Sequence, residues 1–264
     1  MSSTVTAKLP GQLGTPDLEM KNDPRADPRM IAALAPFGLD GKLPPSGVDA
    51  NSSMGALYEY CSATEVGFEA FNDAIFTSLE PVPGVSSRTE IIRGVDSNDI
   101  ALYIHRPDAT SGSLPCIVHT HGGGMVLLKG SAPGYARWRD ELAAAGMVAV
   151  GVEFRNGGGA LGNHPFPAGL NDCASAVRWV GENRDALGIS KIIVSGESGG
   201  GNLSIATGLK ANKEGWIDKI DGIYAQCPYI SNAWAQKSPD LPSLFENDNY
   251  LLDVSSMGAL AKIY

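Results

Sequence analysis

The stretch IVSGESGGGNLSIA, residues 193–206, decides the fold class because it joins a strand pattern to a helix pattern through one serine among glycines. The β-branched run at its start is typical of a buried strand, and the segment after the glycines predicts a helix. Residues 196–200, GESGG, match the pattern G-x-S-x-G in the strand-turn-helix context that this pattern requires. Small neighbours permit a sharp turn that raises the Ser198 hydroxyl above the sheet. The alternative is a glycine-rich turn whose serine only caps the helix.

A second glycine-rich motif, HGGG, begins at His121, directly after the predicted strand PCIVHT. Consecutive glycines let backbone N–H groups point into the space where a tetrahedral oxyanion forms, since no Cβ shields them. Alone, the motif is as typical of a flexible loop or a phosphate cradle as it is of an oxyanion-binding loop. Together with the serine turn, it predicts nucleophilic acyl-transfer chemistry.

Strand and helix patterns alternate along most of the chain. Six short β-rich runs are bounded by Gly, Pro or Asp: TEIIRGV (89–95), IALYIHRP (100–107), PCIVHTHGG (115–123), MVAVGVEFR (147–155), KIIVSGE (191–197) and GIYAQCP (222–228). Helical patterns lie between them: YARWRDELAAAG (135–146), GLNDCASAVRWVGENRDALG (169–188) and NLSIATGLKANKEG (202–215). Two antiparallel strands followed by strand-helix repeats predict an α/β fold with a doubly wound, mostly parallel sheet.

The N-terminal region has a different character. Residues 1 to about 50 are rich in Pro, Gly and Asp and predict an irregular arm, with one short helix near residues 30–34. From residue 52 to residue 79, apolar positions recur at three- and four-residue spacings. This spacing predicts one or two amphipathic helices, with a break near Gly67.

Composition narrows the classes of partner. The chain of 264 residues carries 29 acidic against 20 basic residues and no run of Lys or Arg, which argues against a nucleic acid or an anionic membrane. A neutral or small organic substrate fits better. No apolar stretch approaches the roughly 18 residues of a membrane span, and the N-terminus lacks a signal-peptide core, so we expect a cytoplasmic protein. The four cysteines are far apart and predict reduced thiols rather than a metal site.

The segments HGGGMVLLKG, VGVEFRNGGGALGNHPFPAGLNDCASAVRWV and GESGGGNLSIATGLK, in this order, resemble the bacterial hormone-sensitive-lipase-like esterases of the α/β-hydrolase fold. The resemblance covers residues 81–264 as the core and implies that residues 1–80 form an arm and a helical cap. It implies Ser198 as the nucleophile of a carboxylic-ester hydrolase that uses no cofactor or metal. It implies an oxyanion hole made of the amides of Gly123, Gly124 and Gly199. The same motifs imply supporting residues: His121, Gly122, Gly196, Glu197 and Gly200.

Two departures from the family pattern concern the substrate pocket. Met125 stands where many members carry an aromatic residue after the glycines. Residues 156–159, NGGG, replace the commoner L-A-P-E. We therefore expect a pocket that differs from that of short-chain generalist esterases.

The partners that should activate the serine are not evident in the sequence. In the family, a carboxylate and then a histidine follow the nucleophile, on loops after the last strands. After residue 231 the sequence predicts only a loop and one helix, so the last two core strands are absent, and no histidine follows Ser198. The later acids lie too near Ser198 in sequence to match the family acid: Glu246, Asp248 and Asp253. The other histidines are predicted away from the serine: His105 and His119 on strands, and His164 in a loop that enters a helix.

Three interpretations remain open at this point. The chain is part of a longer esterase whose Asp/His pair lies beyond Tyr264, it is a natural truncation, or it is a catalytically dead receptor that binds a small molecule in the old pocket. We favour the first, because a sheet that ends at its sixth strand exposes an apolar edge. Amidase or peptidase chemistry would use the same machinery. The expected partner is a small-molecule ester, and the resemblance also implies a homodimer.

Overall fold

The computed structural model describes residues 11–110, 112–235 and 240–264. The first ten residues of the predicted arm lie outside this part. Contacts divide the described chain into two compact units, one formed by residues up to Leu57 together with Ser231–Lys262, and the other by Tyr58–Ile230 with the last two residues. The predicted division into an arm and cap, residues 1–80, and a core, residues 81–264, stays a prediction.

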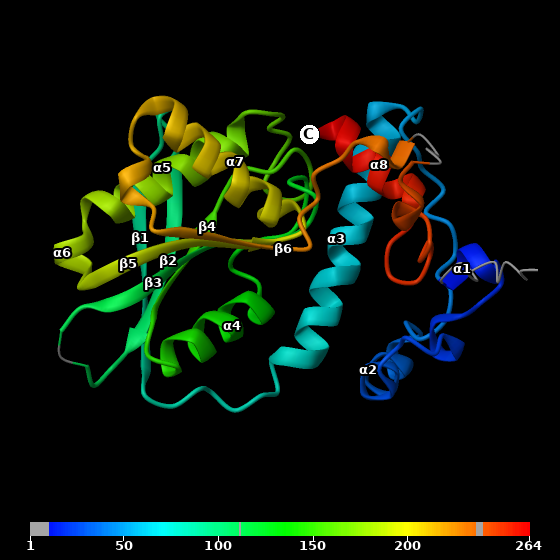
Figure 1. Ribbon diagram of the computed structural model, residues 1–264, viewed down its shortest axis with the longest axis horizontal. Helices are drawn as coiled ribbons and strands as arrows, with labels where there is room; N and C mark the ends of the chain where they lie inside the picture. Colours follow the sequence, from blue (N-terminus) through cyan, green and yellow to red (C-terminus); the bar gives the residue numbers. More distant parts are fainter. Residues whose placement is uncertain (1–10, 111, 236–239) are drawn as a thin grey trace, which may run out of the picture. The chain divides into compact units, whose positions relative to one another are not determined.

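The larger unit is built on one mixed sheet in the order β1-β2-β4-β3-β5-β6 (Figure 1). β1 is antiparallel to β2 and β2 to β4, whereas β3 runs parallel to β4 and β5, and β5 parallel to β6. Each strand overlaps one of the six predicted runs, with bounds that differ by up to four residues: β1 Val85–Arg93, β2 Asp99–Pro107, β3 Leu114–Thr120, β4 Val148–Glu153, β5 Ile189–Glu197 and β6 Gly222–Gln226. The central β4 is buried at its first five positions, as expected of a strand covered on both faces.

Helices cover both faces of this sheet, as the sequence predicts. Figure 1 shows α4 (Pro133–Ala144) on one face and α5 (Ala168–Glu182) with α7 (Gly199–Glu214) on the other. The short elements α6 (Arg184–Leu187) and η3 (Ile217–Lys219) complete the connections. The chain thus has the predicted doubly wound α/β architecture, and six strands are present in the described residues.

Helix α3 (Met54–Phe76) is one unbroken helix, so the predicted break near Gly67 is not found. Gly67 is exposed, and a Cβ placed on it would meet no atom within 4 Å. A glycine inside a helix costs only about 1 kcal/mol relative to alanine. The fully buried Cys61 and the buried Glu65 fix the same helix by tertiary contacts, which outweigh that cost.

The smaller unit is mostly irregular, as the composition of the arm predicts. Its elements are α1 (Gly11–Gly14), η1 (Met20–Asn22), α2 (Pro28–Leu34), η2 (Ala35–Phe37), η4 (Ala233–Ala235), η5 (Pro242–Leu244) and α8 (Val254–Ile263). The amide of Leu43 donates to the carbonyl of Asn249 at 2.7 Å, so the arm pairs with the C-terminal segment. The acids of that segment accept hydrogen bonds from other residues of the smaller unit. Glu246 accepts from the Arg25 side chain, Asp253 accepts from the Ser46 amide, and Asp248 accepts from the Val254 amide.

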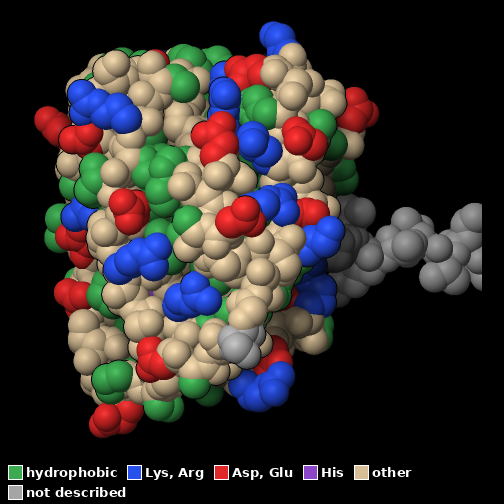
Figure 2. Space-filling model, turned by 90° about the vertical axis from the view of Figure 1, so that its left-hand side faces the viewer, with side chains coloured by type: hydrophobic (Ala, Val, Ile, Leu, Met, Phe, Trp, Pro, Cys, Tyr) green, Lys and Arg blue, Asp and Glu red, His purple; other side chains and the backbone are tan. Residues whose placement is uncertain are grey.

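Charged side chains of both signs are interspersed over the face drawn in Figure 2. Ion pairs of the larger unit such as Arg184–Asp221 at 2.8 Å and Lys191–Asp221 at 3.0 Å are of this mixed kind. Among the described helices, none has the length and hydropathy that crossing a bilayer requires. All four cysteines are free, and Cys227 is the exposed one.

Candidate active site

Ser198 occupies the sharp turn between β5 and α7. Its backbone has φ 54° and ψ −119°, a strained conformation for a residue with a Cβ. The turn is fixed on both sides, since the Ser198 amide donates to the carbonyl of Gln226 at 3.0 Å and its carbonyl accepts from Tyr229 at 2.9 Å. The side chain is half-buried, and the strain is held by backbone bonds rather than by the hydroxyl.

The glycines around Ser198 allow a close approach of strand and helix. A Cβ on Gly200 would lie 1.9 Å from the carbonyl oxygen of Thr120 at the end of β3, and a Cβ on Gly196 would lie 2.4 Å from the carbonyl of Gly200. The Thr120 hydroxyl also bonds the Gly200 carbonyl oxygen at 2.8 Å. The start of α7 is therefore packed against the end of β3, where the HGGG motif begins.

The loop after β3 places unpaired amides beside the serine turn. Gly123 and Gly124 have φ of 94° and 62°, values that favour glycine. The Gly123 carbonyl accepts the amides of Val126 and Leu127, both at 3.0 Å. The Gly124 N–H belongs to the same trans peptide, so it points away from these two amides. In the described chain, neither the Gly123 nor the Gly124 amide makes a hydrogen bond. Gly124 N would lie 2.7 Å from a Cβ on Gly199, so these residues meet.

Unpaired amides in a buried loop are uncommon, because an amide without an acceptor loses its solvation at full cost. Gly199 adds a third free donor, since the first amides of a helix have no partner inside it. The positive end of the α7 dipole also favours negative charge at this place. Backbone amides without acceptors are the kind of donor that binds an anion.

Glu197 connects the serine turn to the HGGG loop. Its carboxylate accepts the Gly122 amide at 2.7 Å and the Tyr135 hydroxyl at 2.8 Å, and it lies 2.8 Å from His119 Nε2. Burial alone would raise the pKa of Glu197, but the bonds from His119, Tyr135 and Gly122 lower it overall. The carboxylate is thus held ionised between the two motifs.

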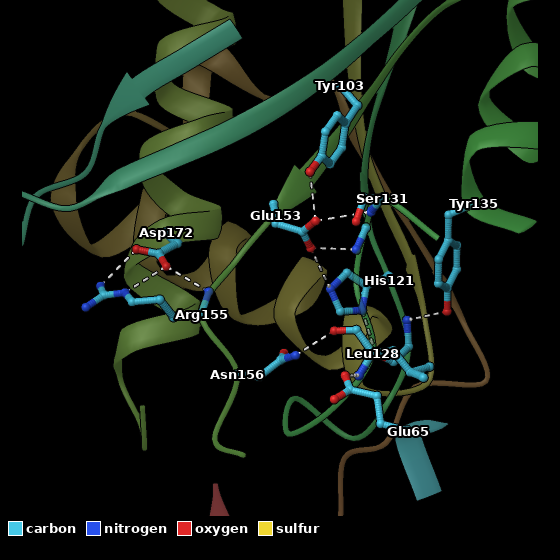
Figure 3. A network of polar contacts seen from close by, with 12 residues as sticks. Glu65, Tyr103, His121, Leu128, Ser131, Tyr135, Glu153, Arg155, Asn156 and Asp172 are labelled. Atoms are coloured by element: carbon cyan, nitrogen blue, oxygen red, sulfur yellow. Dashed lines mark hydrogen bonds and ion pairs between the residues drawn. The ribbon is translucent and has the colours of Figure 1, made fainter. Parts of the chain in front are cut away.

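A second carboxylate, Glu153 at the end of β4, binds the far part of the same loop (Figure 3). It accepts the amides of Gly130 at 2.6 Å and Ser131 at 3.2 Å, and the hydroxyl of Tyr103 at 2.8 Å. The Gly130 carbonyl accepts in turn from the buried Arg139 at 2.8 Å. This end of the loop is fixed by charged partners on both of its backbone groups.

His121 lies inside the loop and is fully buried. Its ring stacks on Phe154 with centroids 4.1 Å apart, and Nδ1 lies 2.9 Å from the carbonyl oxygen of Gly122. Nε2 has no hydrogen bond in the described chain and faces the Glu153 carboxylate at 4.0 Å (Figure 3). Burial lowers the pKa of His121 to about 4, so the neutral ring supports the loop.

The remaining histidines are bound to other residues. His105 on β2 lies 2.6 Å from Asp140 and accepts from Arg139 at 3.1 Å, and burial lowers its pKa. His119 on β3 pairs with Glu197, and the His164 amide donates to the carbonyl of Asn156 at 2.8 Å. Within the described residues, no hydrogen bond joins a histidine to Ser198.

The departures at Met125 and residues 156–159 belong to one structural feature. The amides of Gly157 and Gly158 donate to the carbonyls of Met125 and Val126 at 3.0 and 2.9 Å. A Cβ on Gly158 would lie 3.6 Å from the sulfur of Cys61 on α3. Glycines therefore stand at 157–159 because this loop runs between the HGGG loop and helix α3.

Several residues that hold the site were missed in the sequence. Glu65, Glu153, Asn156 and Tyr135 act on backbone groups far away in the chain, and no local pattern identifies those partners. One signal was available for Glu65, since a glutamate stands four residues after Cys61 on the apolar face of a predicted helix. A charge on such a face indicates a buried bonding partner.

A cavity of about 710 Å³ lies beside Glu197, between the second half of α3 and the start of α4. Aromatic residues including Phe68, Phe76, Tyr135 and Trp138 line it, and Ser198 does not. The cavity therefore lies beside Glu197 and its hydrogen-bond partners, and Ser198 is not part of its lining. No group of three or more His, Cys, Asp or Glu in the described chain is arranged to hold a metal ion.

Comparison with known proteins agrees with this architecture. A family model described as alpha/beta hydrolase fold matches residues 117–264. The solved structure of brefeldin A esterase, a bacterial homologue of human hormone-sensitive lipase, superposes with a TM-score of 0.92 at 44% identity, covering 97% of this chain and 73% of that one. Esterase Est22 gives a TM-score of 0.77 at 38% identity, covering 92% of this chain and 72% of its own.

Among curated proteins, carboxylesterase NlhH of Mycobacterium tuberculosis is 38% identical over 108 residues, which are 40% of this chain and 32% of NlhH. The chain thus matches about a third of the length of that relative. The predicted resemblance and fold are confirmed by these matches together with the sheet order. The chain belongs to the α/β-hydrolase fold family, among the bacterial homologues of hormone-sensitive lipase.

Proposed function

We propose that this protein is a carboxylic-ester hydrolase that works through an acyl-enzyme on Ser198. One observation carries the proposal: the strained serine turn lies against a loop in which the amides of Gly123, Gly124 and Met125 make no hydrogen bond within the described residues. The names of its relatives, carboxylesterase and esterase, support the same reaction class. The amide of Gly199 completes the oxyanion hole.

The reaction takes place in two stages at one carbonyl carbon. Ser198 Oγ bonds to that carbon while a base takes its proton, and the carbonyl oxygen becomes an oxyanion that the three amides stabilise. The intermediate collapses, the alkoxide leaves with a proton, and water then hydrolyses the acyl-serine by the same steps. Removing one oxyanion donor typically costs about 3–4 kcal/mol of barrier stabilisation.

The general base is assigned to an Asp/His pair of the kind that serine hydrolases use. The rings of His105, His119 and His121 are bonded to other groups, and within the described residues no hydrogen bond joins His164 to Ser198. Without the histidine, turnover of a serine hydrolase falls on the order of a million-fold. Neutral ester hydrolysis therefore depends on that pair, whereas the oxyanion site is formed by residues of this chain.

The proposed partner is a small-molecule ester, handled without a metal or organic cofactor. The acidic balance of the chain, 29 acids against 20 basic residues, supports a neutral substrate rather than a nucleic acid. A cytoplasmic location, a homodimer, and the role of residues 1–80 as a cap over the site are parts of the same proposal. The supporting roles of Gly122, Gly196, Glu197 and Gly200 follow from their contacts with the two motifs.

The test is covalent labelling by a fluorophosphonate together with hydrolysis of p-nitrophenyl acetate, both carried out on the full natural protein with its Asp/His pair. We expect mass spectrometry to find the label on Ser198, and Ser198→Ala to abolish both labelling and turnover. The control variant is Ser190→Ala, which removes an exposed serine at the start of the same strand and should change neither. Turnover by Ser198→Ala within tenfold of the parent would refute the mechanism. Saturable ester binding with no label on Ser198 would instead indicate a receptor.

A further inference from the structure

Glu65 is a buried carboxylate that joins helix α3 to both glycine-rich loops. Its side chain is 3% exposed. One oxygen accepts the amide of Leu128 at 2.8 Å, and the other accepts the amide of Ala160 at 2.5 Å. Leu128 ends the HGGG loop, and Ala160 ends the NGGG loop. A buried charge is costly unless it is bonded, so these two amides explain why the carboxylate is tolerated there.

Leu128 needs such support because its backbone is strained. It has φ 79°, in the left-handed region that residues with a Cβ rarely adopt. Strain of this kind persists only where the surroundings fix it. Glu65 holds the amide of Leu128, and the Asn156 side-chain amide donates to its carbonyl at 2.6 Å (Figure 3). Both backbone groups of the strained residue are thereby bound.

The strained residue is four positions after Gly124, whose amide the proposed oxyanion hole uses. Leu128 directly follows Leu127, whose amide donates to the Gly123 carbonyl and so orients the peptide of Gly124. A change at Leu128 is therefore transmitted through one short turn to the oxyanion donors. The NGGG loop is moved with it, because Gly157 and Gly158 pair with Met125 and Val126.

We propose that Glu65 is a positioning residue for the oxyanion hole: from helix α3, it holds the HGGG and NGGG loops in the arrangement that presents the Gly123 and Gly124 amides. The expected effect of Glu65 on reaction rate rests on the proposed function, whereas its effect on the two loops does not. Glu65 touches neither the serine nor the free amides, so its removal lowers the rate of bond formation at Ser198 and leaves ligand affinity unchanged.

A matched control lies one turn further along the same helix. Glu69 is exposed and forms an ion pair with Lys129, whereas Glu65 is buried and binds backbone amides. Glu65→Leu removes both acceptors at similar volume, Glu65→Gln keeps one acceptor oxygen, and Glu69→Gln removes only the exposed charge. The three variants therefore distinguish the effect of losing the Glu65 hydrogen bonds to backbone amides from the effect of losing a negative charge on α3.

The first measurement is amide hydrogen exchange, read by mass spectrometry over residues 122–130 and 157–162. We expect exchange about tenfold faster or more in both segments of Glu65→Leu, a smaller change in Glu65→Gln, and none in Glu69→Gln. Urea unfolding of each variant corrects for loss of global stability. Exchange in both segments equal to that of the parent, after this correction, would overturn the proposal.

The second measurement uses the full natural protein with its Asp/His pair. It is the rate at which a fluorophosphonate labels Ser198, fitted for its saturating rate and its half-saturating concentration. We expect Glu65→Leu to lower the saturating rate about tenfold or more at an unchanged half-saturating concentration, with partial recovery in Glu65→Gln. An unchanged saturating rate would overturn the positioning role. If Ser198 of the parent resists the reagent, the proposed function fails by itself, and hydrogen exchange alone decides whether Glu65 holds the loops.

Discussion

His121 makes the stability of the larger unit depend on pH in a direction that its surroundings determine. The ring is 1% exposed, stacked on Phe154, and bonded through Nδ1 to the carbonyl of Gly122. Burial is the largest influence on it and lowers its pKa to about 4, while the nearby Glu153 and Glu197 carboxylates raise it by less. The folded protein therefore keeps this ring neutral at a pH where an unfolded chain would protonate it.

The magnitude follows from the two pKa values. An unfolded histidine titrates near 6.5, so between pH 6.5 and pH 4 the unfolded chain binds a proton that the folded protein refuses at His121. The contribution of His121 to stability is fully present above pH 6.5 and is lost as the pH falls toward 4. Across the interval from pH 7.5 to pH 5.0 this loss amounts to about 2 kcal/mol.

The assay is urea unfolding at pH 7.5 and pH 5.0 of the parent, of His121→Gln, and of His164→Gln as a control at a half-buried loop position. Other groups titrate alike in all three proteins, so their contribution cancels in the comparison. We expect His121→Gln to lose about 2 kcal/mol less than the parent over this interval, and His164→Gln to follow the parent more closely. Equal losses in the parent and His121→Gln, or an imidazole of His121 that titrates near pH 6.5 by NMR, would refute the reasoning.

Two glycine substitutions test whether a Cβ has room at Gly200 and at Gly67, and they should change the free energy of unfolding in opposite directions. Gly200→Ala places a Cβ 1.9 Å from the Thr120 carbonyl oxygen, and we expect it to lower the free energy of unfolding by about 3 kcal/mol or more, measured by urea unfolding. Gly67→Ala places its Cβ in open space on α3, so we expect a gain of up to about 1 kcal/mol by the same measurement. A neutral Gly200→Ala would contradict the close approach of β3 and α7, and a destabilising Gly67→Ala would mean that position 67 has a packing partner.

The strands and the doubly wound sheet could be anticipated because the decisive information is local. The run before Ser198, the β-branched strands and the helical spacings each lie within a few residues, and a doubly wound sheet is what such an alternation builds. The smaller unit shows the opposite case. Leu43 pairs with Asn249 across some two hundred residues, and nothing in the composition of either segment identifies the other. Long-range pairing of irregular segments is therefore beyond a reading of local patterns.

The same distinction between local and long-range information applies to the candidate active site. The HGGG and GESGG motifs predict which amides come together, because glycines permit both the turn and the close approach. The residues that hold those amides could not be predicted, since Glu65 binds Leu128 from 63 positions away and Glu197 binds Gly122 from 75. Gly67 shows the limit of the same local rule, because tertiary packing of α3 overrides a single unfavourable propensity.

The order of bound and free amides along the HGGG loop explains how it is prepared for an anion. Carboxylates accept the amide of Gly122 at its start, of Leu128 near its end, and of Gly130 beyond it. Between them, the amides of Gly123, Gly124 and Met125 have no acceptor within the part of the chain that the structure describes, and Gly199 approaches at this place. Because the flanking donors are already bound to fixed charges, the oxyanion of the proposed mechanism would require no reorganisation of the loop, which is the condition under which such donors contribute most.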